Sequence, residues 1–245
     1  MTRPTLAVVS AMHEELRALL PLLDDCRIQR IAGRDFHQGH LHGQPIVMVL
    51  SGIGKVAAAA TAVLLMQAFD VQRLVFTGVA GGLHADVAVG DVIVGRQLLQ
   101  HDMDASPLFP RFEVPLTGRA RFDADPLLSD ALAAAVRRLP GVRLHQGLIV
   151  SGDRFVSSAA QSDALRAVLP DALAVEMEGA AVAQVCADFG RPCAVVRTIS
   201  DRADDSAHVD FARFIEEVAS ATTRAIIENW LRDGAHSADA ASTVR

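Results

Sequence analysis

LAVVSAMHEELRALLPLL, residues Leu6–Leu23, passes from one pattern of apolar side chains to another. Leu6–Ser10 is apolar almost throughout, which is typical of a strand that is buried on both faces. In His13–Leu23 the leucines recur at helical spacing, so we expect an amphipathic helix directly after the strand. A buried strand that leads straight into a helix is the repeating unit of α/β proteins.

The same alternation of strands and helices continues along the chain. Further strands are predicted at Pro45–Leu50, Arg73–Thr77, Asp91–Leu99, Leu144–Val150, Leu173–Glu176 and Cys193–Ile199. Further helices are predicted at Val56–Phe69, Pro126–Arg138, Gln161–Leu169, Gly179–Phe189 and Phe211–Arg232. Phe36–Leu50 has glycines between two strand-like pieces and predicts a hairpin, so we expect a mixed sheet with helices on both faces.

No linker or internal repeat interrupts this pattern, and one domain is predicted over residues 3–233. Asp102–Arg121 contains three prolines, one glycine and two phenylalanines without clear periodicity, which indicates a long loop. Loops of this length inside a compact domain are usually functional or disordered. Residues 234–245 are small and polar and are predicted to be a disordered tail.

The composition excludes several classes of protein. With 51% apolar and 21% charged residues among 245, the chain has the balance of a soluble globular protein. The net charge is −6 and Lys55 is the only lysine, which disfavours nucleic acid and anionic membranes as partners. Cys26, Cys186 and Cys193 are an odd number in core-like segments, so we expect no disulfide framework and a cytoplasmic location. No targeting or transmembrane segment is visible.

Polar motifs follow many of the predicted strands, at the sheet edge where α/β proteins bind ligands. They are Met12–Glu15 (MHEE), Ser51–Lys55 (SGIGK), Thr77–Gly82 (TGVAGG), Ser151–Val156 (SGDRFV), Val175–Gly179 (VEMEG) and Ser200–Asp201 (SD). Most also have a structural explanation, because acids suit a first helical turn, glycines form turns and aspartate caps helices. Glu176 and Glu178 lie at the end of an apolar strand, where a buried acid is expected to have either a partner that compensates its charge or a role in function. Arg197, among apolar residues, is expected to pair with a carboxylate.

Two nucleotide-binding motifs are rejected. Ser51–Lys55 lacks the spacing of a phosphate loop, because Val56 stands where serine or threonine is required. Thr77–Gly82 lacks the G-x-G-x-x-G fingerprint and is not followed at once by a helical pattern, which argues against dinucleotide binding. What remains at these positions is a turn whose backbone can approach something closely.

Taken in this order, the motifs resemble those of the methylthioadenosine/S-adenosylhomocysteine nucleosidases, within the purine nucleoside phosphorylase family. The resemblance runs over about residues 5–232 and rests on A-M-x-E-E, S-G-I-G-K-V-A-A-A, T-G-x-A-G-G, V-G-D, I-V-S-G-D-x-F, V-E-M-E-G-A and V-R-x-I-S-D. It implies a single-domain three-layer α/β/α fold with a central mixed β-sheet. It also implies an enzyme of methionine salvage that needs no metal or cofactor and hydrolyses the N-glycosidic bond of 5′-methylthioadenosine. S-adenosylhomocysteine and 5′-deoxyadenosine are further substrates of this kind.

The resemblance assigns a role to each matching residue. Glu15 matches the carboxylate that activates water, Asp201 the acid at N7 of the departing adenine, and Glu178 the acceptor for the ribose hydroxyls. The residues expected to bind substrate are Met12, Ile53, Gly81, Phe155, Val156, Glu176, Met177, Ser200 and Phe211. Cleavage develops positive charge on the sugar and negative charge on the base. We therefore expect a raised pKa at Asp201 and an ionised Glu15.

Phosphorolysis and loss of catalysis are the two alternatives. A phosphorylase of the family adds arginines and a serine around the glycine-rich turn. Here Val79 stands where a hydroxyl is common, and no arginine lies between Gly78 and Asp91, so water is the favoured nucleophile. Many nucleosidases also have serine or threonine at the position of Val79. Retention of all three predicted catalytic carboxylates argues against a protein that only binds nucleosides.

The resemblance further implies a homodimer. In the family, the pocket for the 5′ substituent has an apolar lining, and Phe211 lies at a matching position. A loop of the neighbouring subunit helps to close this pocket. The matching loop is Ser106–Pro115 (SPLFPRFEVP), and the apolar helix after Gly54 is a second candidate for the interface.

Overall fold

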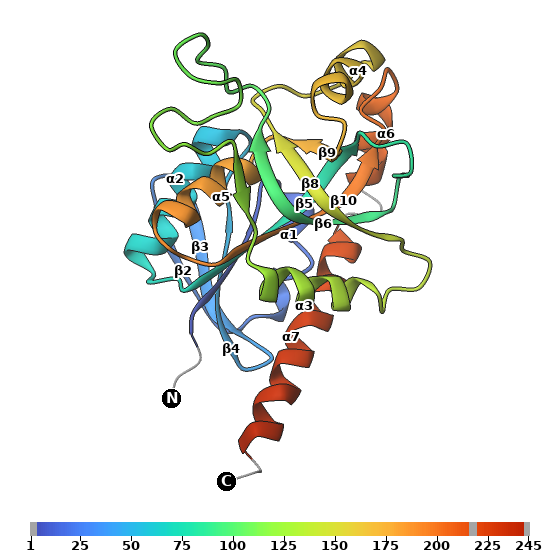
Figure 1. Ribbon diagram of the computed structural model, residues 1–245. Helices are drawn as coiled ribbons and strands as arrows, with labels where there is room; N and C mark the ends of the chain where they lie inside the picture. Colours follow the sequence, from blue (N-terminus) through green and yellow to red (C-terminus); the bar gives the residue numbers. More distant parts are fainter. Residues whose placement is uncertain (1–3, 216–219, 243–245) are drawn as a thin grey trace.

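One β-sheet forms the centre of the molecule in the computed structural model, which describes residues 4–215 and 220–242 (Figure 1). Its strands are β1 (Leu6–Ser10), β2 (Asp24–Ile31), β3 (Arg34–Leu41), β4 (Gln44–Leu50), β5 (Arg73–Gly82), β6 (Val92–Gln100), β7 (Arg121–Asp123), β8 (Leu144–Ser151), β9 (Ala172–Glu176) and β10 (Cys193–Asp201). The helices are α1 (His13–Leu16), the 3-10 helix η1 (Leu20–Leu22), α2 (Lys55–Ala68), α3 (Pro126–Val136), α4 (Ala159–Val168), α5 (Gly179–Asp188), α6 (Ala207–Phe214) and α7 (Ser220–Ser242).

Strand β1 lies inside the sheet, and all of its residues are buried. It pairs in parallel with β4 on one side and with β5 on the other. β3 pairs antiparallel with both β4 and β2, and the β3–β4 pair is the hairpin predicted from Phe36–Leu50. The sheet therefore contains both orientations, and the prediction of a mixed sheet is confirmed.

The strands β5, β10, β6, β8 and β9 close into a ring. β10 pairs with both β5 and β6, β8 lies between β6 and β9, and β9 pairs back with β5. Within this ring Gly81 of β5 is opposite Asp201 of β10 and opposite Val175 of β9. The closure therefore brings the ends of β9 and β10, which carry the acidic motifs, to the same place.

Helices cover both faces of the sheet (Figure 1). α2 and α5 pack against each other over one core cluster, which includes Phe36, Leu65 and Phe76. α3 and α7 pack together over a second cluster, which includes Leu132 and Ile227. This is the three-layer α/β/α arrangement that the sequence analysis expects.

The prediction of one helix over His13–Leu23 is wrong beyond Leu16. α1 is short and η1 follows it, because Pro21 has no N–H group with which to continue the α-helical hydrogen bonds. The predicted helix over Phe211–Arg232 corresponds to the end of α6, which begins earlier, at Ala207, and to the first part of α7. Residues 216–219 lie outside the described part of the chain.

Two further segments differ from their sequence patterns. β2 is missing from the predicted strands because it is exposed along nearly its whole length and so lacks apolar alternation. Thr77–Gly82 continues β5 and is not a turn. Its glycines allow close contact with side chains, because a Cβ at Gly78 would lie 2.5 Å from Glu15 Oε1 and one at Gly81 2.9 Å from Asp201 Oδ1.

The C-terminal segment also differs. α7 continues to Ser242 and includes most of residues 234–245, which the sequence analysis expects to be disordered. The segment contains several alanines, and alanine has the highest intrinsic helix propensity. Residues 243–245 lie outside the described part, and the domain boundary at residue 233 stays a prediction. Among the described residues, the helices are too short or too polar to cross a lipid bilayer.

Candidate active site

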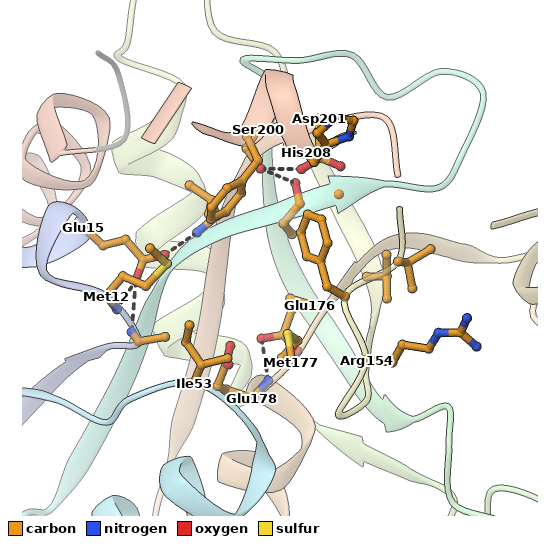
Figure 2. A pocket seen from close by; sticks show the side chains of 18 residues that line it. Met12, Glu15, Ile53, Arg154, Glu176, Met177, Glu178, Ser200, Asp201 and His208 are labelled. Carbon is orange, nitrogen blue, oxygen red and sulfur yellow. Dashed lines mark hydrogen bonds between the residues drawn. The ribbon is translucent and has the colours of Figure 1, made fainter. Parts of the chain in front are cut away.

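A cavity of about 430 Å³ opens where the ends of β1, β5, β9 and β10 meet (Figure 2). All of the predicted site residues line it, although they come from segments that are distant in sequence. The lining consists of Ala11, Met12, Glu15, Ile53, Val79, Ala80, Gly81, Arg154, Phe155, Val156, Val175, Glu176, Met177, Glu178, Ser200, Asp201, His208 and Phe211. The topology of the sheet thus brings together the motifs that the sequence presents separately.

Glu15 lies on α1 with its carboxylate buried at one end of the cavity. Its Oε2 accepts hydrogen bonds from the N–H groups of Ala11 (3.0 Å) and Met12 (2.9 Å), and its Oε1 accepts one from Val79 (3.0 Å). Burial raises the pKa of Glu15 overall, and the charge of Arg197 and the three N–H groups offset only part of this rise. The protein therefore offers the ionised form of this carboxylate several compensating interactions.

Glu176 is already occupied by partners within the protein. Arg197 donates to its Oε2 at 2.5 Å, and this fully buried guanidinium also lies 4.4 Å above the centre of the Phe76 ring. The hydroxyl of Ser151 and the N–H of Gly179 donate to the same carboxylate. The expected internal partner of Arg197 is thus Glu176, and this side chain lines the cavity with both oxygens engaged.

Glu178 is buried two residues further along, immediately before α5. In the described part of the structure its side chain accepts one hydrogen bond, from Gly54 N–H at 2.8 Å. Burial and the neighbouring charge of Glu176 raise the pKa of Glu178 to about 8, against the opposing charge of Arg197. Unlike Glu176, this carboxyl group has hydrogen-bonding capacity left for a ligand.

Asp201 lies at the end of β10, across the cavity from Glu15 (Figure 2). Its Oδ2 accepts a hydrogen bond from the Ser200 hydroxyl (2.8 Å), and its Oδ1 accepts one from Ala203 N–H (2.8 Å). Burial raises the pKa of Asp201, and the charges of Asp204 and Asp210 raise it further. These surroundings favour the protonated form, which can donate a hydrogen bond into the cavity.

The remaining lining is largely apolar. The Phe155 and Phe211 rings meet edge to face, with centroids 5.7 Å apart, and Phe155 is 42% exposed. Phe211 also packs with Met12, Val79 and other apolar side chains in a small cluster beside Glu15. A flat apolar ring system and a small apolar substituent would both find complementary surface here.

Arg154 and His208 also line the cavity and are absent from the predicted set. Both lie in segments that contain predicted site residues, but arginine and histidine occur throughout the sequence, so residue type alone does not single them out. Figure 2 places His208 beside Asp201 and turns the Arg154 guanidinium away from the carboxylates. Within residues 4–215 and 220–242, no group of His, Cys, Asp and Glu side chains is arranged to hold a metal ion.

Comparison with known proteins identifies relatives over nearly the whole chain. A family model described as the phosphorylase superfamily matches residues 5–232. The 5′-methylthioadenosine/S-adenosylhomocysteine nucleosidase of Chromohalobacter salexigens is 37% identical over 88% of this chain and 92% of its own. The aminodeoxyfutalosine nucleosidase of Helicobacter pylori is 39% identical over 89% of this chain and 94% of its own.

Solved structures agree with this result. The crystal structure of the 5′-methylthioadenosine/S-adenosylhomocysteine nucleosidase from Neisseria meningitidis, in complex with methylthio-immucillin-A, superposes with a TM-score of 0.89 at 35% identity. The match covers 94% of this chain and 99% of that one. The expectation of a nucleoside phosphorylase-like fold is therefore confirmed.

Proposed function

The chain belongs to the phosphorylase superfamily, and from this premise we propose that it is a nucleosidase, which hydrolyses the N-glycosidic bond of 5′-methylthioadenosine. Water attacks the anomeric carbon of the ribose as the bond to N9 of adenine breaks. The products are adenine and 5-methylthioribose. The observation that carries the proposal is the pair of buried carboxyl groups, Glu15 and Asp201, in one cavity. Burial raises the pKa of both, but the nearby charge is positive at Glu15, from Arg197, and negative at Asp201, from Asp204 and Asp210.

Glu15 is the general base in this proposal. The N–H groups of Ala11, Met12 and Val79 fix the carboxylate and stabilise its charge. A fixed, ionised carboxylate can take one proton from water as the new C–O bond forms. Val79 provides only its backbone N–H to Glu15, so a side-chain hydroxyl at this position is not needed to hold the base.

Asp201 is the general acid. Departing adenine carries negative charge, and a proton given to N7 neutralises it as the glycosidic bond breaks. The raised pKa favours the protonated form of Asp201, and the hydrogen bonds from Ser200 and Ala203 fix its orientation. Phe155 offers a face on which adenine stacks, with the backbone of Val156 at its edge and Gly81 beneath the acid.

Glu178 binds the ribose. Its free hydrogen-bonding capacity suits the 2′- and 3′-hydroxyls, and in its ionised form Glu178 stabilises the positive charge that develops on the sugar. Met177 packs against the sugar, while Glu176 and Arg197 form the buried ion pair beside it. Ile53 and Met12 complete the wall on the side of Glu15 and Glu178 (Figure 2).

The charges around the cavity support water over phosphate as the nucleophile. The basic residues among its described lining are Arg154 and His208, while four carboxyl groups face the same space. Arg197 is nearby but is already paired with Glu176. A phosphate dianion would find few partners in such surroundings, since it needs several unpaired donors or cations.

The apolar cluster beside Glu15 supports a methylthio group as the 5′ substituent, because this group offers no hydrogen bonds. Relatives named as methylthioadenosine/S-adenosylhomocysteine nucleosidases extend the proposal to S-adenosylhomocysteine. The H. pylori relative has the name of a nucleosidase for aminodeoxyfutalosine, so that nucleoside belongs in the same substrate panel.

The assembly in this proposal is a homodimer in the cytoplasm, in which Ser106–Pro115 of one subunit approaches the pocket of the other. Leu108 in this loop is 83% exposed, and Val56 at the start of α2 is 81% exposed. Apolar side chains exposed to this extent are suited to an interface. Sedimentation velocity should give the mass of two chains, and a monomer at micromolar concentration would contradict this part of the proposal.

Adenine release is the test of the proposed activity. Purified protein is incubated with 5′-methylthioadenosine, S-adenosylhomocysteine and aminodeoxyfutalosine in phosphate-free buffer, and free adenine is measured by chromatography. We expect catalytic release from methylthioadenosine, whereas Asp201→Asn under the same conditions should be nearly inactive. A folded wild-type protein that releases adenine from none of the three nucleosides would contradict the proposal.

A further inference from the structure

Lys55, the only lysine of the chain, forms an ordered set of contacts next to the cavity. It is the first residue of α2, and its side chain is 17% exposed. The ammonium donates to Asp102 Oδ1 at 2.6 Å and to Gln100 Oε1 at 3.1 Å. Lys55 therefore connects the start of α2 to the end of β6 and to the loop that follows.

Lys55, Asp102 and Asp153 form a closed set of interactions, here called the Lys55 clamp. The backbone N–H of Lys55 donates to Asp153 Oδ1 at 2.7 Å, and the N–H of Asp153 donates to Asp102 Oδ2 at 2.9 Å. The Lys55 ammonium completes the circuit on the other oxygen of Asp102. Three segments that are distant in sequence are thus fixed relative to one another.

The clamp lies directly beside the donor that orients Glu178. Gly54 precedes Lys55, and its N–H donates to Glu178 Oε1 at 2.8 Å. Gly54 has a φ of +96°, which other residues rarely adopt, and a Cβ there would lie 3.1 Å from Asp153 Oδ1. A displacement of the Lys55 backbone would therefore shift the adjacent Gly54 N–H relative to Glu178.

We propose that Lys55 is a positioning residue for cleavage, because its clamp with Asp102 and Asp153 holds the Gly54 N–H against the ribose-binding Glu178. The inference rests on the proposed function of Glu178 and extends the site to residues that do not line the cavity. A role in stability alone would leave the ionisation of Glu178 unchanged, so the two roles predict different results.

The ionisation of Glu178 gives the discriminating signal. The groups that face this carboxyl are Glu176 and Glu15, which disfavour its charge, and Arg197 and the Gly54 N–H, which favour it. Loss of the Gly54 hydrogen bond raises the pKa of Glu178 further. If ribose binding in the transition state needs the ionised form, the acid limb of kcat/KM moves to higher pH.

The experiment replaces the ammonium and then restores it. Lys55→Cys removes the cation, and 2-bromoethylamine then alkylates the thiol, displacing bromide and forming a thioether analogue of lysine. Wild-type protein treated in parallel controls for alkylation of the exposed Cys26. Arg224→Met is the control variant, because it removes a cation and an exposed ion pair on α7, away from the cavity. Adenine release from methylthioadenosine is followed across pH, and circular dichroism reports folding.

We expect Lys55→Cys to lower kcat about tenfold and to move the acid limb upward by about half a pH unit, since small displacements of a positioned group are costly. Alkylation should restore both values, and Arg224→Met should change neither. A folded Lys55→Cys protein with the wild-type profile overturns the inference. So does an alkylated protein that is folded and fully modified but not restored.

A second variant keeps the test decisive if Lys55→Cys does not fold. Asp102→Asn keeps the shape of the side chain but removes its charge, and we expect the same upward movement of the acid limb. An unchanged limb in that variant overturns the inference. Failure of the proposed function is recognised separately, because wild-type protein would then release no adenine.

Discussion

The surroundings of Glu15 and those of Asp201 differ in a way that matters for catalysis. Both carboxyl groups are buried and lie on opposite sides of one cavity, and burial raises the pKa of each. Around Glu15, three N–H groups and the charge of Arg197 favour ionisation. Around Asp201, two hydrogen bonds favour ionisation, but the charges of Asp204 and Asp210 oppose it.

Burial alone therefore does not determine the role of an acid. The groups around the carboxyl select whether it accepts or donates a proton. Hydrolysis of a glycosidic bond needs one group of each kind, at the water and at the leaving base. The following predictions alter one side of the cavity and leave the other in place.

The largest effect is expected at the acid. Asp201→Asn keeps the shape of the side chain and a hydrogen-bond donor but cannot release a proton to N7. We expect kcat for methylthioadenosine to fall about 10³-fold, as for removal of a general acid. Steady-state kinetics with circular dichroism as the folding control measures this, and a variant with more than about a tenth of wild-type kcat would contradict the assignment.

The next effect is expected at the base. In Gly78→Ala the new Cβ would lie 2.5 Å from Glu15 Oε1, so the carboxylate must move away from Val79 N–H. We expect kcat to fall about 10²-fold, because the base is displaced by about an ångström. The thermal unfolding midpoint is recorded in parallel, and a folded variant with normal kcat would show that the position of Glu15 is not important.

A smaller effect is expected where one hydrogen bond tunes the acid. The Ser200 hydroxyl lowers the pKa of Asp201, so Ser200→Ala should raise that pKa. Asp201 acts in its protonated form, and a higher pKa keeps it protonated to higher pH. The basic limb of kcat/KM should therefore move upward, with a loss of about threefold in kcat from the weaker acid. A limb that moves to lower pH would reverse the assigned role.

The fold could be predicted from the sequence in its local parts. Apolar runs such as Leu6–Ser10 predict buried strands, and the motifs after them mark the edge where the cavity opens. The ring that β10 closes with β5 depends on pairing between strands that are distant in sequence. The residue pattern of one segment cannot predict which other strand that segment pairs with. β2 is exposed along nearly its whole length, and its sequence contains no sustained run of apolar residues.

The site likewise combines residues that the sequence predicts with contacts that only the tertiary structure determines. Motif spacing collects residues such as Glu15, Glu178 and Asp201, and the structure brings them to one cavity; their catalytic roles stay predictions. The apolar sequence around Arg197 predicts a carboxylate partner, but only the tertiary structure identifies that partner as Glu176. The Gly54 donor to Glu178 is a backbone group, so no side-chain pattern could predict it.

The use of water as the nucleophile is tested most directly by following phosphate itself. Methylthioadenosine and inorganic phosphate are incubated with the protein, adenine is measured by chromatography, and ³¹P NMR follows the phosphate. We predict that adenine accumulates at the same rate with and without phosphate and that the phosphate signal is unchanged. Adenine release only in the presence of phosphate, with an equal amount of a sugar 1-phosphate, would contradict hydrolysis.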